Sequence, residues 1–208
     1  MITRLVLAAA LLFSNVSFAP PQNFTYYLLS LSWAPDFCAQ KNVPKDPAEC
    51  GVGRKVAFVV HGLWPQDASG TGPENCGKAG TIPPDVIKAT LPYIPTEKLI
   101  GHEWATHGTC SGLSAADYFA AARKARDAVT VPKELTSPTK SQKLRPADIE
   151  SKFAAANPAF PKAAFRTSCT SGELQETRIC FNKDLSPEAC PSAVKECSSK
   201  TILVRPVR

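Results

Sequence analysis

Histidine is scarce in this chain of 208 residues, which contains only three. No two cysteines have the C-x-x-C spacing of a zinc ribbon or a thioredoxin-like redox site. No Gly-x-Ser-x-Gly segment marks a nucleophilic serine. After the N-terminal region, no stretch approaches the roughly 18 apolar residues of a membrane span. These absences argue against zinc-ribbon, dithiol-redox, serine-hydrolase and integral membrane proteins.

The first 19 residues have the layout of a secretory signal peptide. Arg4 supplies a positive charge, residues 5–13 form a short apolar run, and Ala19 ends a segment suited to signal peptidase. We therefore expect residues 20–208 to form one mature domain, exported to a periplasm or out of the cell and free of the membrane after cleavage.

Eight cysteines lie in the mature region, and an even number behind a signal peptide predicts four disulfides. Their spacing does not choose among the 105 possible pairings. The formal net charge is +6, and it falls to +5 when Arg4 is removed with the signal peptide. This modest excess suits a polyanion without identifying one.

Hydrophobic patterning predicts an α+β fold, a single domain with a central, largely antiparallel sheet flanked by helices and stapled by disulfides. Ser114 and Asp117 form a capping box that opens a helix whose basic side chains face mostly solvent. Strands are expected over residues 26–33, 56–60, 164–169, 173–181 and 201–205. Further helices are expected over residues 85–94, 96–104 and 146–156, and loops over residues 67–84 and 137–145.

Two of the histidines, His102 and His107, lie five residues apart, whereas His61 ends the second expected strand. The segment from His102 resembles the H-E-x-x-H zinc motif, whose histidines are spaced i, i+4. An i, i+5 spacing turns the second ring about 140° from the first, so a continuous helix cannot aim both at one ion. The spacing argues against a zinc site, and we expect no metal.

Histidine is the side chain best suited to moving protons near neutral pH. Cleaving RNA through its own 2′-hydroxyl needs one group to remove that proton and another to protonate the leaving 5′-oxygen. Donors or cations must also stabilise charge on the phosphorane. Because the substrate supplies the nucleophile, this chemistry needs no cofactor.

Two segments resemble the active-site motifs of the ribonuclease T2 family. They are residues 61–65 (HGLWP) and residues 102–110 (HEWATHGTC), in the order that the family has them. The likeness extends through residues 26–38 and 173–180, and so covers most of the mature chain. It implies a monomeric, metal-independent endoribonuclease that cleaves single-stranded RNA, with low base specificity, through a 2′,3′-cyclic phosphate.

The resemblance also implies a role for each motif residue. His61 would protonate the leaving 5′-oxygen, and His107 would accept the 2′-hydroxyl proton. His102 would bind the phosphate, and Glu103 would stabilise the phosphorane or hold the histidines in place.

These segments do not settle which residues recognise the bases of RNA. Trp64 would either stack on a base or pack in the core, whereas Trp104 is expected in the core. Gln66 borders a possible base pocket, and its amide can pair with several bases. Leu99 stands where some relatives place an aromatic, which leaves the second base site open.

Thr106 departs from the family pattern, which usually has a lysine there to neutralise charge on the phosphorane. A threonine offers one neutral hydrogen bond, and charge-assisted bonds are roughly twice as strong. A lysine or arginine from another segment would have to substitute. The resemblance further implies four disulfides: Cys38–Cys50, Cys76–Cys110, Cys169–Cys197 and Cys180–Cys190.

Three functions therefore stay open. The first is an active endoribonuclease, and the second is a catalytically weak relative that binds RNA, suggested by Thr106. The third is a secreted metallohydrolase, which the histidine spacing disfavours.

Overall fold

The computed structural model describes residues 23–41 and 46–208, so the expected signal peptide lies outside the described residues. The strands are β1 (Tyr26–Trp33), β2 (Phe58–Gln66), β3 (Gln142–Leu144), β4 (Phe165–Thr170), β5 (Glu173–Asn182) and β6 (Ile202–Val204). The α-helices are α1 (Ala34–Phe37), α2 (Pro47–Cys50), α3 (Pro84–Thr90), α4 (Glu97–Thr106), α5 (Ala115–Asp127) and α6 (Pro146–Ala156). Short 3₁₀ turns are η1 (Gly108–Cys110), η2 (Lys133–Leu135) and η3 (Lys162–Ala164).

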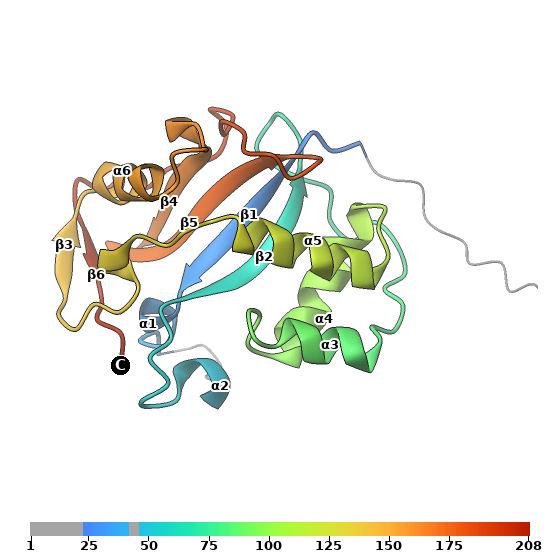
Figure 1. Ribbon diagram of the computed structural model, residues 1–208, viewed down its shortest axis with the longest axis horizontal. Coiled ribbons are helices and arrows are strands. Elements are labelled where there is room, and N and C mark those ends of the chain that lie inside the picture. Colours follow the sequence, from blue (N-terminus) through green and yellow to red (C-terminus); the bar gives the residue numbers. More distant parts are fainter. Residues whose placement is uncertain (1–22, 42–45) are drawn as a thin grey trace, which may run out of the picture.

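One twisted sheet organises these elements (Figure 1). Its strand order is β2-β1-β5-β6-β3, and β4 also pairs with β5. Four of these pairings are antiparallel, and β5 with β6 is the parallel one. The predicted α+β fold with a largely antiparallel sheet is confirmed.

Alternation along β1 separates the two faces of the sheet. Leu29 and Leu31 join the main hydrophobic core with Phe119 of α5 and Phe153 of α6. The alternate residues, including the buried Ser30, face the other way. Helices α5 and α6 therefore cover one face, and the opposite face is left for a site lined by polar side chains.

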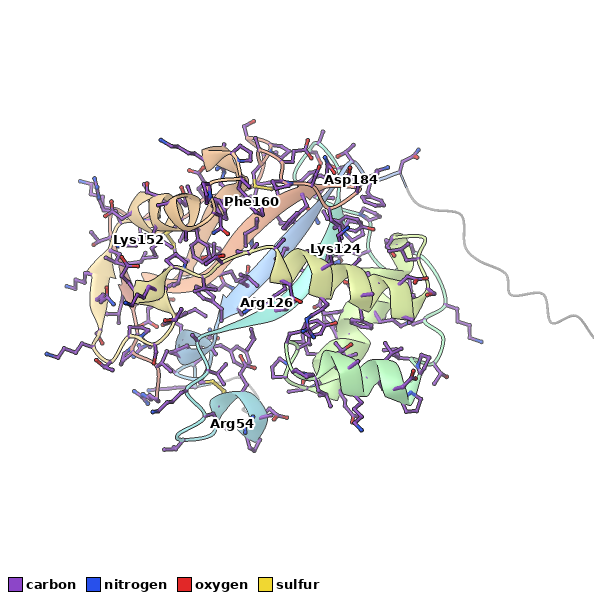
Figure 2. The ribbon with its side chains drawn as sticks, in the orientation of Figure 1. Arg54, Lys124, Arg126, Lys152, Phe160 and Asp184 are labelled. Carbon is purple, nitrogen blue, oxygen red and sulfur yellow. A yellow bond between two sulfur atoms is a disulfide. The ribbon has the colours of Figure 1, made fainter. Side chains whose placement is uncertain are left out.

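The basic residues of α5 lie on the helix that covers the core face. Figure 2 shows Lys124 and Arg126 on this helix, and both Arg123 and Lys124 are exposed. Arg123 Nε pairs with Asp127 at 2.6 Å. This face matches the expected solvated helix surface, remote from the polar face of the sheet.

Several boundaries differ from the sequence prediction; the expected helix 85–94, for example, ends at Thr90 as α3. Two of the differences concern the sheet. Strand β2 continues through Gln66, so His61 lies inside the strand and not at its end. The expected loop 137–145 contains β3, because Gln142–Leu144 pair with β6 and complete the edge of the sheet. Short strands whose stability comes from a distant partner carry little local signal.

Helix α4 begins at a threonine cap and ends within the second motif. The Thr96 hydroxyl accepts a hydrogen bond from the Leu99 N–H at 3.1 Å. The helix ends at Thr106, and His107 becomes its C-cap, with φ −115°. His102 and His107 are therefore not on one continuous helix, so the 140° separation expected for a continuous helix does not describe them.

The structure pairs the eight cysteines as Cys38–Cys50, Cys76–Cys110, Cys169–Cys197 and Cys180–Cys190, the pairs that the resemblance implies. The second of them joins the loop after β2 to the end of the second motif. Hydrogen bonds reinforce it, from Asn75 N–H to the Thr106 carbonyl at 2.8 Å and from Cys76 N–H to Thr109 Oγ1 at 3.2 Å.

In the part of the chain that the structure describes, no helix has both the length and the apolar character required for a membrane crossing.

We expect the double variant Cys76→Ser/Cys110→Ser to lose both stability and the RNA cleavage expected from the motifs. The disulfide closes a separation of 34 residues, and a loop of this size contributes on the order of 3 kcal/mol to the free energy of unfolding. Urea unfolding and cleavage of RNA, at a temperature where the variant is folded, measure the two effects.

The matched control is Cys169→Ser/Cys197→Ser, whose disulfide closes a similar separation of 28 residues. It should lose comparable stability and keep its activity while folded. Equal activity in the two folded variants would show that the Cys76–Cys110 link does not serve the site.

Candidate active site

A β-bulge presents His61. Ser30 of β1 pairs with Gly62, and the next residue, Leu31, pairs with Val60, so His61 is the extra residue of β2. A bulge of this kind bends a strand and redirects a side chain, and bulges are frequent beside active sites. The imidazole of His61 is therefore held by rigid sheet backbone on the polar face.

The ring of His61 reaches over β1 to a carboxylate on β5. Its Nδ1 lies 2.8 Å from Glu176 Oε1, and Glu176 Oε2 accepts a hydrogen bond from Arg178 Nε at 2.9 Å. Ser32 pairs with Glu176 and Ser30 pairs with Arg178. Because these serines are small, the side chains of β2 and β5 can meet above β1.

A second carboxylate, Glu103 of α4, lies on the other side of His61. It is fully buried, and its Oε1 is 3.7 Å from His61 Nε2 and 4.0 Å from His102 Nε2. Its Oε2 accepts a hydrogen bond from Trp64 Nε1 at 2.8 Å. Gly62 makes this approach possible, because a Cβ there would overlap the Glu103 carboxylate.

The other motif residues gather around this pair. The His102 side chain is 59% exposed, and its Nδ1 lies 3.4 Å from the hydroxyl of Thr106 one turn later. His107 is buried, and its Nδ1 has no hydrogen-bond partner among the described residues. The Trp64 ring lies close to both His61 and His107, 5.2 Å from the first ring and 5.3 Å from the second.

Trp64 and Trp104 have different surroundings. The guanidinium of Arg178 lies over the Trp64 ring, 5.8 Å from its centroid. Trp104 packs against the main core beside Gly108 and Tyr118. Trp64 is thus part of the histidine cluster, and Trp104 has the core position expected for it.

The environment shifts the pKa values of His61 and His107 in opposite directions. Burial opposes the charge on His61, but the hydrogen bond to Glu176 and the charges of Glu103 and Glu176 outweigh it and raise the pKa. For His107, burial and the neighbouring His102 and His61 lower the pKa to about 4. His61 therefore keeps its proton to a higher pH than an ordinary histidine, and His107 stays neutral to a lower pH.

The pKa values of the two carboxylates, Glu103 and Glu176, are also shifted in opposite directions. Burial raises the pKa of Glu103 to about 7, against the lowering effects of His61 and Trp64. Burial would raise the pKa of Glu176 as well, but hydrogen bonding by His61 and the charge of Arg178 bring it below its usual value. Glu176 is thus the charged partner of His61, and Glu103 titrates near neutrality.

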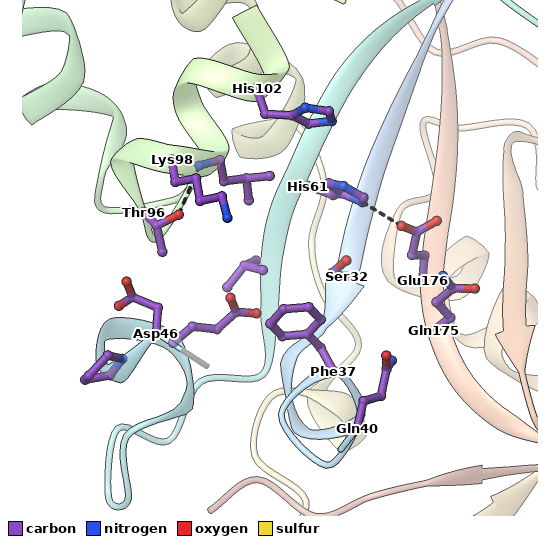
Figure 3. A pocket seen from close by; sticks show the side chains of 14 residues that line it. Ser32, Phe37, Gln40, Asp46, His61, Thr96, Lys98, His102, Gln175 and Glu176 are labelled. Atoms are coloured by element: carbon purple, nitrogen blue, oxygen red, sulfur yellow. Dashed lines mark hydrogen bonds and ion pairs between the residues drawn. The ribbon is translucent and has the colours of Figure 1, made fainter. Parts of the chain in front are cut away.

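Two pockets open on either side of the histidines. The larger, with a volume of about 600 Å³, is lined by His61, His102, Glu176 and Leu99 among others. Figure 3 shows His61 and His102 facing this pocket, with Lys98 extending from α4 beside them. The smaller, about 310 Å³, is lined among others by Trp64, Gln66, His107 and Arg178.

The described residues contain no group of three or more His, Cys, Asp or Glu side chains arranged to hold a metal ion. The site consists of acid–base and hydrogen-bonding groups.

The sheet places a histidine, at a β-bulge, between two buried carboxylates, and these groups can transfer protons. Residues 24–190 match the model of the Ribonuclease T2 family. The chain belongs to the ribonuclease T2 family, and it is a ribonuclease of that family.

Individual relatives support this family membership. A curated ribonuclease from Aeromonas hydrophila is 31% identical over 195 residues, which cover 89% of this chain and 87% of the relative. Among solved structures, trichomaglin, described as an S-like ribonuclease, is similar with a TM-score of 0.70 and 25% identity, over 89% of this chain and 98% of its own. RNase NT, solved in complex with 5′-AMP, has a TM-score of 0.67 at 20% identity, over 89% and 100% of the two chains.

The structure brings together all seven non-cysteine residues that the sequence singled out: His61, Trp64, Gln66, His102, Glu103, Thr106 and His107. Sequence reasoning missed Glu176 and Arg178. A signal was present, because these two charged residues are two apart in the expected strand 173–181 and so share one face of it. Only the pairing of β5 with β1 reveals that they face His61.

We expect Gly62→Ala to reduce RNA cleavage about 100-fold, because the new methyl group displaces the Glu103 carboxylate and a misplacement of about 1 Å has effects of this size. Steady-state cleavage of a short RNA, with circular dichroism to verify folding, measures the change.

Gly80→Ala is the control, because a Cβ at that position meets no atom within 4 Å. It should cleave RNA at the wild-type rate. A folded Gly62→Ala variant with full activity would contradict the importance of the close approach of Glu103.

Proposed function

We propose that this protein is an endoribonuclease that cleaves single-stranded RNA by transesterification, through a 2′,3′-cyclic phosphate and without a metal or cofactor. One observation carries the proposal: the rings of His61 and His107 both lie beside the Trp64 ring, 5.2 and 5.3 Å from it. The opposite directions of their pKa shifts support it. A general acid and a general base need this difference at a common pH.

In the proposed reaction, neutral His107 accepts the proton of the 2′-hydroxyl as its oxygen attacks phosphorus. Protonated His61 gives a proton to the 5′-oxygen as the P–O5′ bond breaks. The exposed His102 binds the phosphate, and Glu103 takes part in stabilising the phosphorane or holds the histidine rings. When its carboxyl is protonated it can donate a hydrogen bond to a phosphoryl oxygen.

The two pockets support a substrate with a nucleotide on each side of the scissile phosphate. Trp64 offers a face for base stacking, worth about 1–3 kcal/mol per base, and Gln66 borders the same pocket. Leu99 contributes an aliphatic surface to the other pocket. Stacking and aliphatic contacts tolerate any base, in agreement with low base specificity. The solved complex of RNase NT with 5′-AMP is a nucleotide complex of a similar fold.

Thr106 favours a second candidate, a catalytically weak relative that binds RNA. Two cations line the pockets, Lys98 on the same face of α4 as His102 and Arg178 on β5. We propose that one of them supplies charge that the motif threonine lacks, and that the protein is an active enzyme. The signal peptide and the four disulfides support export of a monomer to a periplasm or out of the cell.

Cleavage should act on RNA and not on DNA, resist EDTA, and fall by about 100-fold or more in His61→Ala and in His107→Ala. Gel assays on single-stranded RNA and DNA, with and without EDTA, check this, and mass spectrometry identifies 2′,3′-cyclic phosphate ends. Cleavage that EDTA abolishes would refute the mechanism. RNA binding without cleavage in the wild type would favour the second candidate.

The pH profile of kcat/KM should be bell-shaped with an acidic to neutral optimum. Below the His107 pKa of about 4, that histidine is protonated and cannot act as a base. Above the raised pKa of His61, the general acid has lost its proton. Initial rates on a dinucleoside monophosphate across the pH range measure both limbs. A rate that continues to rise on the alkaline side would contradict the assignment of His61 as the general acid.

Thr106→Lys should increase kcat on RNA by about tenfold, the effect of roughly 1.4 kcal/mol of added transition-state stabilisation. Single-turnover cleavage by the variant and the wild type gives the comparison. Thr106→Val serves as the control, since it removes the hydroxyl without adding charge. An unchanged rate in Thr106→Lys would show that position 106 does not limit the enzyme.

A further inference from the structure

Two charged residues of β5, Glu176 and Arg178, lie outside the motifs, and the reaction proposed above gives Glu176 no role. Glu176 is 2% exposed. A carboxylate removed from water to this degree costs free energy unless it is paired, and Arg178 and His61 are the groups that pair with it.

The contacts of His61 with the two carboxylates are not equivalent. Its Nδ1 makes a 2.8 Å hydrogen bond with Glu176, whereas its Nε2 is 3.7 Å from Glu103, beyond hydrogen-bond distance. A charged carboxylate has only acceptor atoms, so Glu176 requires the hydrogen on Nδ1. The neutral ring then has an unprotonated Nε2, which is the atom free to exchange a proton with substrate.

Arg178 keeps Glu176 in position. The guanidinium Nε donates to Glu176 Oε2, which leaves Oε1 to His61. The pairing of both residues with serines of β1 fixes their place on the sheet. The result is a chain of contacts, Arg178 to Glu176 to His61, that runs across β1 from one flanking strand to the other.

On these contacts, and resting on the acid role given to His61 in the proposed function, we propose that Glu176 is a positioning residue for the general acid. It fixes the Nδ1–H tautomer of neutral His61, directs Nε2 to the leaving oxygen, and stabilises the imidazolium before the proton is donated. Arg178 holds the carboxylate in the geometry that this needs.

Other charges also act on His61. The titratable and charged groups that face it or interact with it from the surrounding elements are Glu103, His102 and His107 from α4 and its cap, Glu49 from α2, and Arg178 from β5. Arg178 by itself disfavours the imidazolium, and Glu103 and Glu176 favour it. Replacing Glu176 by its amide removes the charge that makes the direct hydrogen bond, so the pKa of His61 should fall.

The first experiment is ¹⁵N NMR of the histidine rings in the full-length mature protein without substrate. At alkaline pH, His61 should be the Nδ1–H tautomer, and in Glu176→Gln its pKa should be lower by about one unit. Glu188→Gln is the control, because it removes one negative charge from an exposed carboxyl of the same type. An Nε2–H tautomer in the wild type, or equal His61 pKa values in wild type and Glu176→Gln, overturns the proposal.

The second experiment is the pH profile of RNA cleavage by the same proteins. The alkaline limb of kcat/KM should move to lower pH in Glu176→Gln, with about a tenfold loss on the alkaline side for a shift of one unit and a smaller loss on the acid side. Glu188→Gln should reproduce the wild-type profile. A uniform loss at all pH values would indicate a structural role for Glu176 and overturn the proposal.

The two measurements distinguish failure of the positioning role from failure of the proposed function. The tautomer and pKa of His61 are measured without turnover, so they test the positioning role even if the wild type does not cleave RNA. A wild type with the Nδ1–H tautomer and no RNA cleavage would contradict the proposed function alone. If Glu176→Gln does not fold, the tautomer of the wild-type protein still decides whether Glu176 orients the ring.

Discussion

Two buried carboxylates, Glu103 and Glu176, flank the imidazole of His61, and the residues around them stabilise this arrangement. Glu176 is stabilised as an anion by Arg178 and His61, so its pKa is low. Glu103 receives one hydrogen bond from Trp64, and burial raises its pKa to about 7. Carboxyls of the same chemical type thus have pKa values shifted in opposite directions within one cluster, because Glu176 is hydrogen-bonded to both His61 and Arg178 whereas Glu103 receives one hydrogen bond, from the neutral Trp64.

The sheet provides the geometry. His61 is offered by a bulge in β2, Glu176 and Arg178 come from β5, and the small serines of β1 leave room for them to meet. Gly62 allows α4 to bring Glu103 against the strand. On the opposite face, α5 and α6 bury the alternate residues of the same strands. A packed core on one side therefore supports a polar cluster on the other with little freedom to move.

Membership of the ribonuclease T2 family places this chain among proteins with a shared fold, and its departures stand out against it. Thr106 lies one turn after His102 on α4, at the position where the family resemblance implies a lysine. The charged groups close to the cluster come instead from β5 and from Lys98 earlier in α4.

Several features could be predicted from the sequence alone, because their signals are local. The apolar and aromatic residues of Tyr26–Trp33, the capping box at Ser114 and the two histidine motifs are local features, and they predicted β1, α5 and the main site residues. Only the tertiary structure decided the rest. The bulge at His61 depends on its register with β1, and the Glu176–Arg178 pair depends on β5 lying beside β1. Pairing between distant strands determines which side chains meet, and no local pattern encodes that choice.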